Sequence, residues 1–196
     1  MTTVIINNSG ASDEQHAINV IVLAFSADPA ARRVFADPMP YLRNFPKFVK
    51  AFGGRAFQHG TAYHINGFLG AALWLPPGVH PDEELLAVLI QETVAEPVRQ
   101  EVFAVMEQMA SHHPSEPHWY LPLIGVDPIQ QGKGLGSALM RHALIRCDRE
   151  KKLAYLESSN RKNVPLYERL GFELIGTIQV GTLKWTPRRG PPEGCC

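Results

Sequence analysis

The sequence predicts a single α/β domain in which a mixed β-sheet carries helices on both faces. The chain has 196 residues, a length that suits one domain with a complete core. Its second half alternates strand-like and helix-like segments, a rhythm typical of sheets covered by helices. We expect the domain to span residues 1–187. Residues 188–196 are expected to form a disordered tail, because their arginines, prolines and glycines offer nothing to a core.

The first half of the chain predicts three strands and two main helices. Ser12-Asp13-Glu14 is a helix start, because it joins a capping residue to early carboxylates, and apolar residues at helical spacing continue to Phe25. A short extra turn is expected at 32–35, and a second helix from about 40 to 58, with an aromatic face. The expected strands are 3–7, 61–65 and 68–75, and Asn66-Gly67 between the last two is a hairpin turn signal.

The second half predicts four more strands. Residues 82–110 are helical by their apolar spacing, and Glu96-Pro97 is expected to divide them into two helices. His112-His113 lies in the loop 111–117 and is expected to be an exposed pair, since no third metal ligand stands at suitable spacing. The remaining expected elements are strand 118–126, helix 134–150, strand 153–158, a short helix at 165–170, and strands 172–177 and 180–185.

Composition argues against several classes of protein. The formal net charge is zero, which argues against nucleic-acid binding through a broad basic face. The longest apolar runs are too short to span a membrane, and the N-terminal apolar run is not preceded by the basic residue of a signal peptide. Cys147, Cys195 and Cys196 form neither a disulfide framework nor a metal-ligand pattern. We therefore expect a cytoplasmic protein, and the paired terminal cysteines have no explanation.

A glycine-rich turn carries the clearest functional signal. It separates an apolar run, stopped by Asp127-Pro128, from an amphipathic helix, and the free N–H groups and dipole of that helix form an anion site. A Walker A loop is excluded, because Gly132-Lys133 is followed by glycine instead of serine or threonine. The dinucleotide pattern Gly-x-Gly-x-x-Gly also fails, since Ser137 stands where its last glycine belongs. The pattern present is Gln131-x-x-Gly134-x-Gly136.

This pattern resembles the Arg/Gln-x-x-Gly-x-Gly/Ala signature of the GNAT N-acetyltransferase superfamily. A second segment resembles the other signature of the family, in which an Asn, a Tyr and a Gly-Phe pair follow a strand. Asn160, Tyr167 and Gly171-Phe172 match that signature position by position. The resemblance is strong over residues 118–177. Farther upstream, the hairpin ending at 70–78 and the helical insertion resemble a small-molecule branch that includes puromycin N-acetyltransferases.

The resemblance implies a GNAT fold and acetyl-coenzyme A as the acyl donor, without a metal. That fold has a mixed, mostly antiparallel sheet of six to seven strands, with helices on both faces and a split between strands 4 and 5. Pro122, which lacks an N–H inside the fourth strand, suits such a split. The glycine turn would bind the pyrophosphate, and the pantetheine arm would lie in the split. The expected cofactor contacts are Leu123, Ile124, Val126, Gln131, Gly132, Lys133, Gly134, Leu135, Gly136, Ser137, Asn160, Asn163 and Tyr167.

The implied reaction is direct attack of a primary amine on the thioester. An alkylammonium resembles lysine, whose pKa is near 10.4, so a base must remove its proton. Glu157 is the first candidate for this base, and Glu116, His118 or a water chain are alternatives. Tyr167 is the candidate acid for the leaving thiolate, because a phenol has a pKa near 10 and the resemblance places this residue beside the sulfur. A strand N–H near Leu123 is the expected donor to the thioester oxygen.

The acceptor site is expected to lie in the half of the chain outside the two signatures. We expect the first two helices, the 82–110 region and the loop before Trp119 to build it. The aromatic second helix favours an apolar or aromatic small-molecule amine. We expect no nucleic-acid or membrane partner, and a monomer or homodimer. Two alternatives stay open: a peptide or protein N-acetyltransferase, and a non-catalytic acyl-coenzyme A-binding module, which would have no need of Tyr167.

Overall fold

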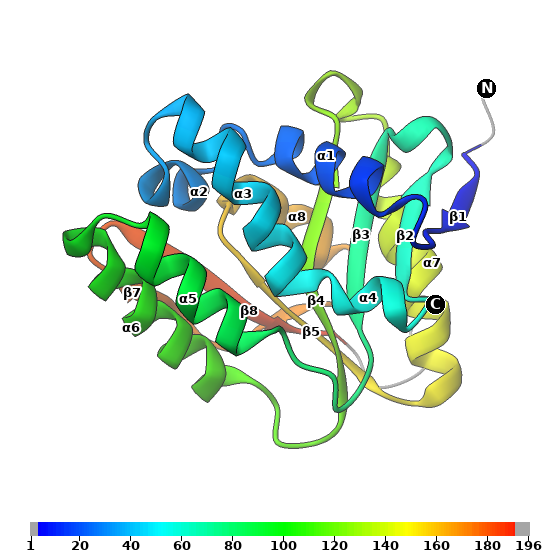
Figure 1. Ribbon diagram of the computed structural model, residues 1–196. Coiled ribbons are helices and arrows are strands. Elements are labelled where there is room, and N and C mark those ends of the chain that lie inside the picture. The colour runs from blue at the N-terminus through cyan, green and yellow to red at the C-terminus, as the bar shows by residue number, and fades with distance from the viewer. Residues whose placement is uncertain (1–3, 191–196) are drawn as a thin grey trace.

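The computed structural model describes residues 4–190 and contains one mixed β-sheet with helices on both faces (Figure 1). Within that range the sheet has eight strands in the order β1-β2-β3-β4-β5-β8-β6, and β7 pairs with β8. All pairs are antiparallel except β4 and β5, which run parallel. The mixed, mostly antiparallel sheet is therefore confirmed. The strands are β1 (Ile6–Asn8), β2 (Ala62–Ile65), β3 (Gly70–Leu75), β4 (His118–Val126), β5 (Leu153–Ser158), β6 (Glu173–Leu174), β7 (Ile178–Val180) and β8 (Leu183–Arg189).

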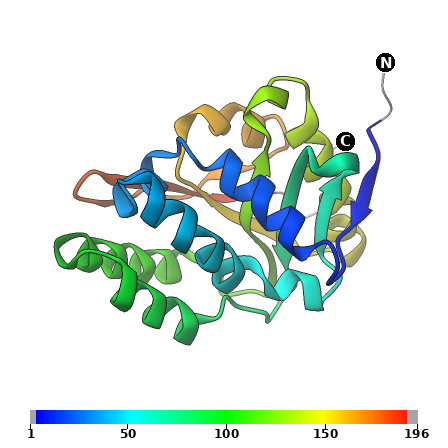
Figure 2. The same cartoon turned by 45° about the horizontal axis from the view of Figure 1, so that its top comes forward.

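Two buried layers hold the helices against the sheet. One layer joins the first helices to the sheet through residues such as Ile21, Val49 and Leu73. The opposite layer packs Leu139 and Met140 against the buried Trp74, which is a core residue. Figures 1 and 2 show α1 and α3 on one face and α7 on the other. The helices are α1 (Glu14–Ala24), α2 (Pro29–Val34), α3 (Pro38–Gly53), α4 (Arg55–Gln58), α5 (Glu83–Thr93), α6 (Glu96–His112), α7 (Leu135–Glu150) and α8 (Val164–Glu168).

Local signals explain most helix boundaries. Asp28 caps α2, where its carboxylate accepts hydrogen bonds from the N–H groups of Ala30 and Ala31. Pro97 lies in the first turn of α6, as expected from a residue that has no N–H to donate there. The single helix expected at 40–58 is two helices, α3 and α4, which meet at Gly54. The short 3₁₀ turn at Asn66–Phe68 replaces the expected two-residue hairpin turn.

The C-terminal strands differ from the prediction. The strand expected at 172–177 shrinks to β6, which holds only Glu173–Leu174. The tail expected from residue 188 is wrong for its first residues, because β8 continues to Arg189 and Arg188 is only 3% exposed. Arg188 lies opposite both Leu156 of β5 and Leu174 of β6, and Gly190 donates a backbone hydrogen bond to Ala154. Residues 191–196, including Cys195 and Cys196, lie outside the described part.

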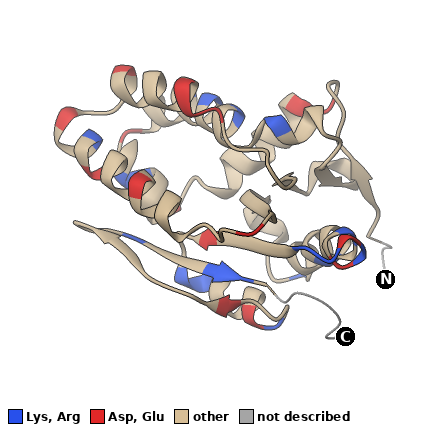
Figure 3. Ribbon diagram, turned by 90° about the horizontal axis from the view of Figure 1, so that it is seen from below, with Lys and Arg blue, Asp and Glu red and all other residues tan. Residues whose placement is uncertain are grey.

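Acidic and basic residues are mixed along the helices. Figure 3 shows acidic and basic residues interspersed along the helices, in keeping with a formal net charge of zero. Across residues 4–190, no helix has both the length and the apolar character that crossing a membrane requires.

Candidate active site

The parallel pair β4–β5 opens partway along its length. His118 to Leu121 pair with Leu153 to Leu156, and the pairing ends there although both strands continue. Pro122 is the first β4 residue beyond the pairing, and it has no N–H to offer a neighbouring strand. On its other edge β4 stays paired with β3 as far as Val126. The predicted split between strands 4 and 5 is confirmed, and it leaves backbone groups of both strands without a partner strand.

The glycine turn lies beyond the end of β4 and starts α7. Gly132 and Gly134 have φ angles of 76° and 80°, in the left-handed region that glycine adopts without strain. No side chain caps α7, and its first intrahelical bond runs from Ala138 N–H to Gly134. The N–H groups of Leu135, Gly136 and Ser137 are therefore free of helical partners and carry the positive end of the helix dipole. This arrangement can hold an anion.

Two side chains of the turn hydrogen-bond within it. The Gln131 amide donates to the carbonyl of Val126 at 3.2 Å. Lys133 Nζ donates to Gln130 Oε1 at 2.8 Å, and Lys133 is exposed. The predicted contacts of Gln131 and Lys133 with phosphate stay predictions. Gln131 stabilises the shape of the turn, while the Lys133 ammonium keeps donors for a second partner.

A cavity of about 140 Å³ lies at the split. One water needs only about 10–15 Å³ measured in the same way, so the cavity can hold a small organic group. Leu121 to Ile124 of β4 and Leu156 to Ser159 at the end of β5 line it. From the predicted site, Leu123, Ile124, Glu157, Asn163 and Tyr167 meet here. Val126, Asn160 and the glycine turn do not line it.

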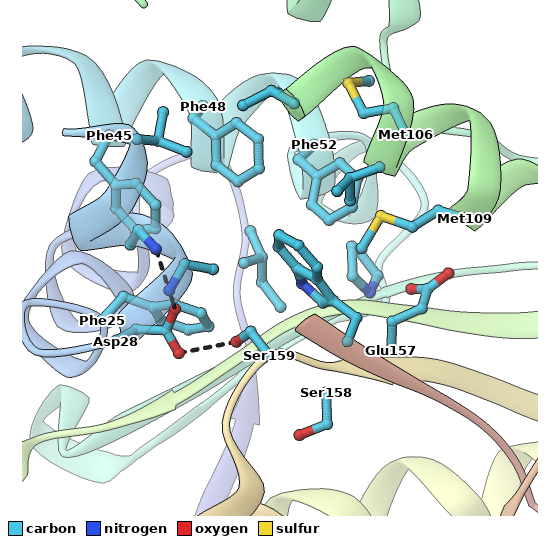
Figure 4. Close-up of a pocket in the computed structure, with 18 of the residues that line it drawn as sticks. Phe25, Asp28, Phe45, Phe48, Phe52, Met106, Met109, Glu157, Ser158 and Ser159 are labelled. Carbon is cyan, nitrogen blue, oxygen red and sulfur yellow. Dashed lines mark hydrogen bonds between the residues drawn. The ribbon is translucent and has the colours of Figure 1, made fainter. Parts of the chain in front are cut away.

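Helices and one distant strand close the apolar side of the cavity (Figure 4). Phe45, Phe48 and Phe52 form a stacked row on α3, with ring centroids 5.5 Å and 5.1 Å apart. Met106 and Met109 of α6 face this row. Of the segments expected to build the acceptor site, the end of the first predicted helix at Phe25, the second predicted helix and the 82–110 region line this cavity. The loop before Trp119 does not line it, and Trp185 of β8 does.

Glu157 is the buried carboxylate of the cavity. Figure 4 shows its side chain pointing from β5 toward the helices, on the side opposite to Ser158. The side chain is 2% exposed, and Oε1 has no hydrogen-bond partner among the described residues. Of the three residues predicted as candidate bases, only Glu157 lines the cavity. Glu116, which is exposed, and His118 are not among its lining residues. A buried carboxylate oxygen without a donor is costly unless a proton or a cation reaches it.

Tyr167 reaches the cavity from α8. It is 4% exposed, and burial raises the pKa of its phenol above the ordinary value of 10, against the opposing charge of Arg188. The phenol is thus a weaker acid than the sequence argument assumed, and it remains protonated throughout the neutral range. Asn160, by contrast, caps the turn before α8, where its Oδ1 accepts from Lys162 N–H. Its predicted contact with the cofactor stays a prediction.

His113 is the residue that sequence reasoning missed. It was expected in an exposed loop, but its ring lies 4.5 Å from the ring of Tyr155 and 4.7 Å from that of Tyr120. Its Nε2 is 3.4 Å from Glu157 Oε1. The end of α6 and β5 are far apart in the sequence and come together only in the folded chain. No local sequence pattern could therefore have indicated the contact between His113 and Glu157. Within residues 4–190, no group of three or more His, Cys, Asp or Glu side chains is placed to hold a metal ion.

Comparisons with known proteins agree with this geometry. Residues 79–172 match the model of the acetyltransferase (GNAT) family. An uncharacterized N-acetyltransferase of Schizosaccharomyces pombe is 27% identical over 192 residues, covering 83% of this chain and 71% of that protein. A Corynebacterium glutamicum structure described as histone acetyltransferase HPA2 and related acetyltransferase covers 99% of each chain, at 23% identity and a TM-score of 0.69.

A polyamine N-acetyltransferase of Drosophila melanogaster has a similar fold, with a TM-score of 0.71 at 15% identity over 95% of this chain and 98% of that one. At such low sequence identities, the likeness to these two solved structures shows a shared fold and nothing about activity. The family match covers the glycine turn, the split strands and Tyr167. Over that segment this chain is therefore similar to the GNAT acetyltransferase family.

Proposed function

We propose that the protein transfers an acetyl group from acetyl-coenzyme A to the primary amine of an apolar small molecule. The observation that carries this proposal is the cavity at the split of β4 and β5. It brings a buried, incompletely hydrogen-bonded carboxylate, Glu157, together with a protonated phenol, Tyr167. These are the two groups that proton removal from an amine and protonation of a thiolate require.

The residues present fit coenzyme A. Free N–H groups at residues 135–137 and the open surface around Gly132 and Gly134 suit a pyrophosphate, because a Cβ built on either glycine meets nothing within 4 Å. The unpaired edge of β4 at Leu123 and Ile124 offers backbone partners to an amide-containing arm. When bound, acetyl-coenzyme A supplies the acetyl group as an activated thioester.

Each residue of the cavity then has a defined task. Glu157 accepts the proton of the substrate ammonium, which frees the nitrogen lone pair for attack. Tyr167 holds a proton ready for the leaving thiolate. A strand N–H near Leu123 is the candidate donor to the thioester oxygen. Closing the site from water with aromatic side chains strengthens each of these electrostatic interactions.

The cavity lining favours a monoamine with an apolar body. Among the described lining residues there is no lysine or arginine that could bind an acidic substrate. Asp28, the other lining carboxylate, already accepts from Ala30, Ala31 and Ser159. A single ammonium can reach Glu157, while the second cation of a polyamine would find no free carboxylate in the cavity. The rest of the substrate would contact phenylalanine and methionine side chains.

Two further observations bear on the alternatives. Helices α2, α3, α5 and α6 wall the cavity on the side away from the sheet, which favours a small molecule over a peptide that needs an open groove. A module that only binds acyl-coenzyme A would gain nothing from a buried carboxylate with one oxygen left without a hydrogen bond, which destabilises the fold. The likeness to the puromycin N-acetyltransferase branch stays a prediction from the sequence.

An amine panel tests the proposal. Release of free coenzyme A from acetyl-coenzyme A would be measured with apolar monoamines, polyamines, amino acids and a peptide with a free amine. We expect the largest kcat/KM for apolar monoamines. Tight binding of acetyl-coenzyme A without turnover of any amine would favour the binding module, and turnover of the peptide alone would favour a peptide acetyltransferase.

Tyr167→Phe tests the acid separately. Removing the hydroxyl should lower kcat by roughly 100-fold, the usual scale for a lost general acid, while the dissociation constant for acetyl-coenzyme A stays unchanged. Tyr63→Phe is the matched control, because Tyr63 is also a buried tyrosine but lies outside the cavity. Equal kcat for wild type and Tyr167→Phe across the pH range would contradict the assignment.

A further inference from the structure

Three side chains connect the buried carboxylate to the outside of the cavity. Glu157 Oε1 lies 3.4 Å from Nε2 of His113, the residue directly after α6. His113 Nδ1 lies 3.1 Å from Nε2 of His118, the first residue of β4. His118 Nδ1 in turn lies 2.9 Å from the backbone carbonyl of Glu116. The exposed fraction of the side chain rises from 2% at Glu157 to 22% at His113. The row therefore leads from the interior toward solvent.

Hydrogen-bond chemistry fixes the protons along this row. A carbonyl oxygen only accepts, so His118 Nδ1 must carry a proton. In neutral His118 the other nitrogen, Nε2, is then an acceptor, and His113 Nδ1 must donate to it. This leaves the Nε2 of neutral His113 as a lone pair that faces a carboxylate oxygen, which is also a lone-pair acceptor. Those two atoms can form a hydrogen bond only when a proton lies between them.

The surroundings keep His118 in the neutral form that this pattern needs. Burial lowers the pKa of His118 below its ordinary value of 6.5, and the neighbouring His113 and His80 lower it further, against the carbonyl of Glu116 and the charge of Glu157. The other titratable groups facing the row are Tyr120 of β4 and Tyr155 of β5. Burial, the charge of Glu157 and the closeness of its carboxylate to each hydroxyl raise the pKa of both phenols above 10, so neither phenol gives up or takes the proton.

We propose that His113 acts through Glu157 as a proton relay. Glu157 removes a proton from the substrate ammonium, and His113 takes this proton from Glu157 and passes it toward solvent. This inference rests on the proposed function. First the substrate N–H bond breaks and an O–H bond forms on Glu157. That O–H bond then breaks as the proton moves to Nε2 of His113, which restores the carboxylate and makes an imidazolium. Finally the imidazolium loses a proton to water, directly or through His118, which holds His113 in the receptive tautomer.

A pair of substrates separates this role from a structural one. Acetylation of an alkylammonium releases one net proton, whereas acetylation of an amine that is already neutral releases none. The probes are 2-phenylethylamine and O-benzylhydroxylamine, which have nearly the same shape. The second is neutral at pH 7 because its oxygen withdraws electrons from the nitrogen. With both substrates, the N–H proton lost as the C–N bond forms is balanced by the proton that Tyr167 gives to the leaving thiolate, so the relay is needed only for the extra proton of the first substrate.

His113→Gln is the central variant, because glutamine can donate to Glu157 Oε1 but cannot take its proton. At pH 7 we expect kcat/KM for 2-phenylethylamine to fall roughly 10- to 100-fold, at or below the lower end of what general acid–base catalysis contributes. The value for O-benzylhydroxylamine should change less than about 2-fold, since no proton needs the relay. His112→Gln is the control, because His112 is the neighbouring histidine but does not contact Glu157, and it should leave both substrates unaffected.

Each outcome decides the proposal. Equal losses on both substrates would assign His113 a purely structural role and overturn the relay, as would no loss on either. If thermal melting shows that His113→Gln does not fold, His118→Phe gives the same comparison, because it removes the acceptor that fixes the tautomer of His113. The expected result is then a smaller loss for 2-phenylethylamine alone. A wild-type enzyme that acetylates no amine would refute the proposed function itself, and the relay with it.

Discussion

The cofactor side and the acceptor side of the cavity are held together by different kinds of interaction. On the cofactor side, the β4–α7 segment acts through its backbone: positive φ angles at Gly132 and Gly134, free N–H groups at the start of α7, and the missing N–H of Pro122. On the acceptor side, the wall formed by α3 and α6 acts through side chains, namely stacked phenylalanines and facing methionines. The cofactor side therefore tolerates only certain residue types at a few positions. The acceptor side needs only apolar side chains of suitable total volume.

This difference explains what each side can recognise. Backbone groups fixed by glycine and by a helix terminus bind a phosphate or an amide in one geometry. Apolar side chains, and methionine above all, can repack around differently shaped ligands. We therefore expect single substitutions on the cofactor side to reduce affinity sharply, and substitutions on the acceptor side to change substrate preference by smaller factors.

Gly134→Val gives the largest expected effect. Gly134 has a φ of 80°, a conformation that costs a β-branched residue roughly 1–2 kcal/mol or more. Relief of that strain would rotate the N–H groups that start α7, and we expect calorimetry to show acetyl-coenzyme A binding weakened by about 100-fold.

Gly78→Val is the matched control for this variant. Gly78 has a φ of 81° and equally open space around its Cα, but it lies in the loop after β3, away from the turn. It should lose similar stability in thermal melting while keeping its affinity. Equal loss of affinity in both variants would mean that general destabilisation, and not the turn, explains the result.

The same difference decides how much the sequence could predict. The bounds of β4 and the loss of its pairing at Pro122 follow from neighbouring residues, because strand patterns, proline and glycine act locally. His113 and Arg188 were misplaced for the opposite reason. His113 packs against Tyr120 and Tyr155, and Arg188 is buried by strand pairing with β5 and β6. No local pattern reveals these contacts. At least six separate segments of the chain line the cavity, so its shape could not be predicted from the sequence either.

Phe52→Ala tests the acceptor side with an intermediate effect. Phe52 lines the cavity and stacks on Phe48, so its removal takes away apolar contact with the substrate body. We expect the KM for the best apolar amine to rise roughly 10-fold, in line with the burial energy of part of an aromatic ring. The KM for acetyl-coenzyme A should not change. Steady-state kinetics with each substrate varied in turn measures both values.

Phe103→Ala is the control on the same side of the molecule. Phe103 belongs to α6 but is 37% exposed and does not line the cavity. It should leave both KM values as in wild type. A rise in the KM for acetyl-coenzyme A alone in Phe52→Ala would show that the phenylalanine row contacts the cofactor, and the division between the two sides would have to be redrawn.

Lys133→Gln gives the smallest expected effect and sharpens the comparison from the cofactor side. If backbone groups dominate phosphate binding, the exposed Lys133 ammonium adds only screened attraction, and its loss should weaken acetyl-coenzyme A binding by about 3-fold at physiological salt. The difference between wild type and variant should shrink further as salt is raised, because screening removes what the charge contributes. Lys47→Gln, which removes an equal charge from the exposed face of α3, should change nothing. A loss as large as that of Gly134→Val would instead mean that the lysine charge holds the phosphate and that the backbone of the turn mainly positions Lys133.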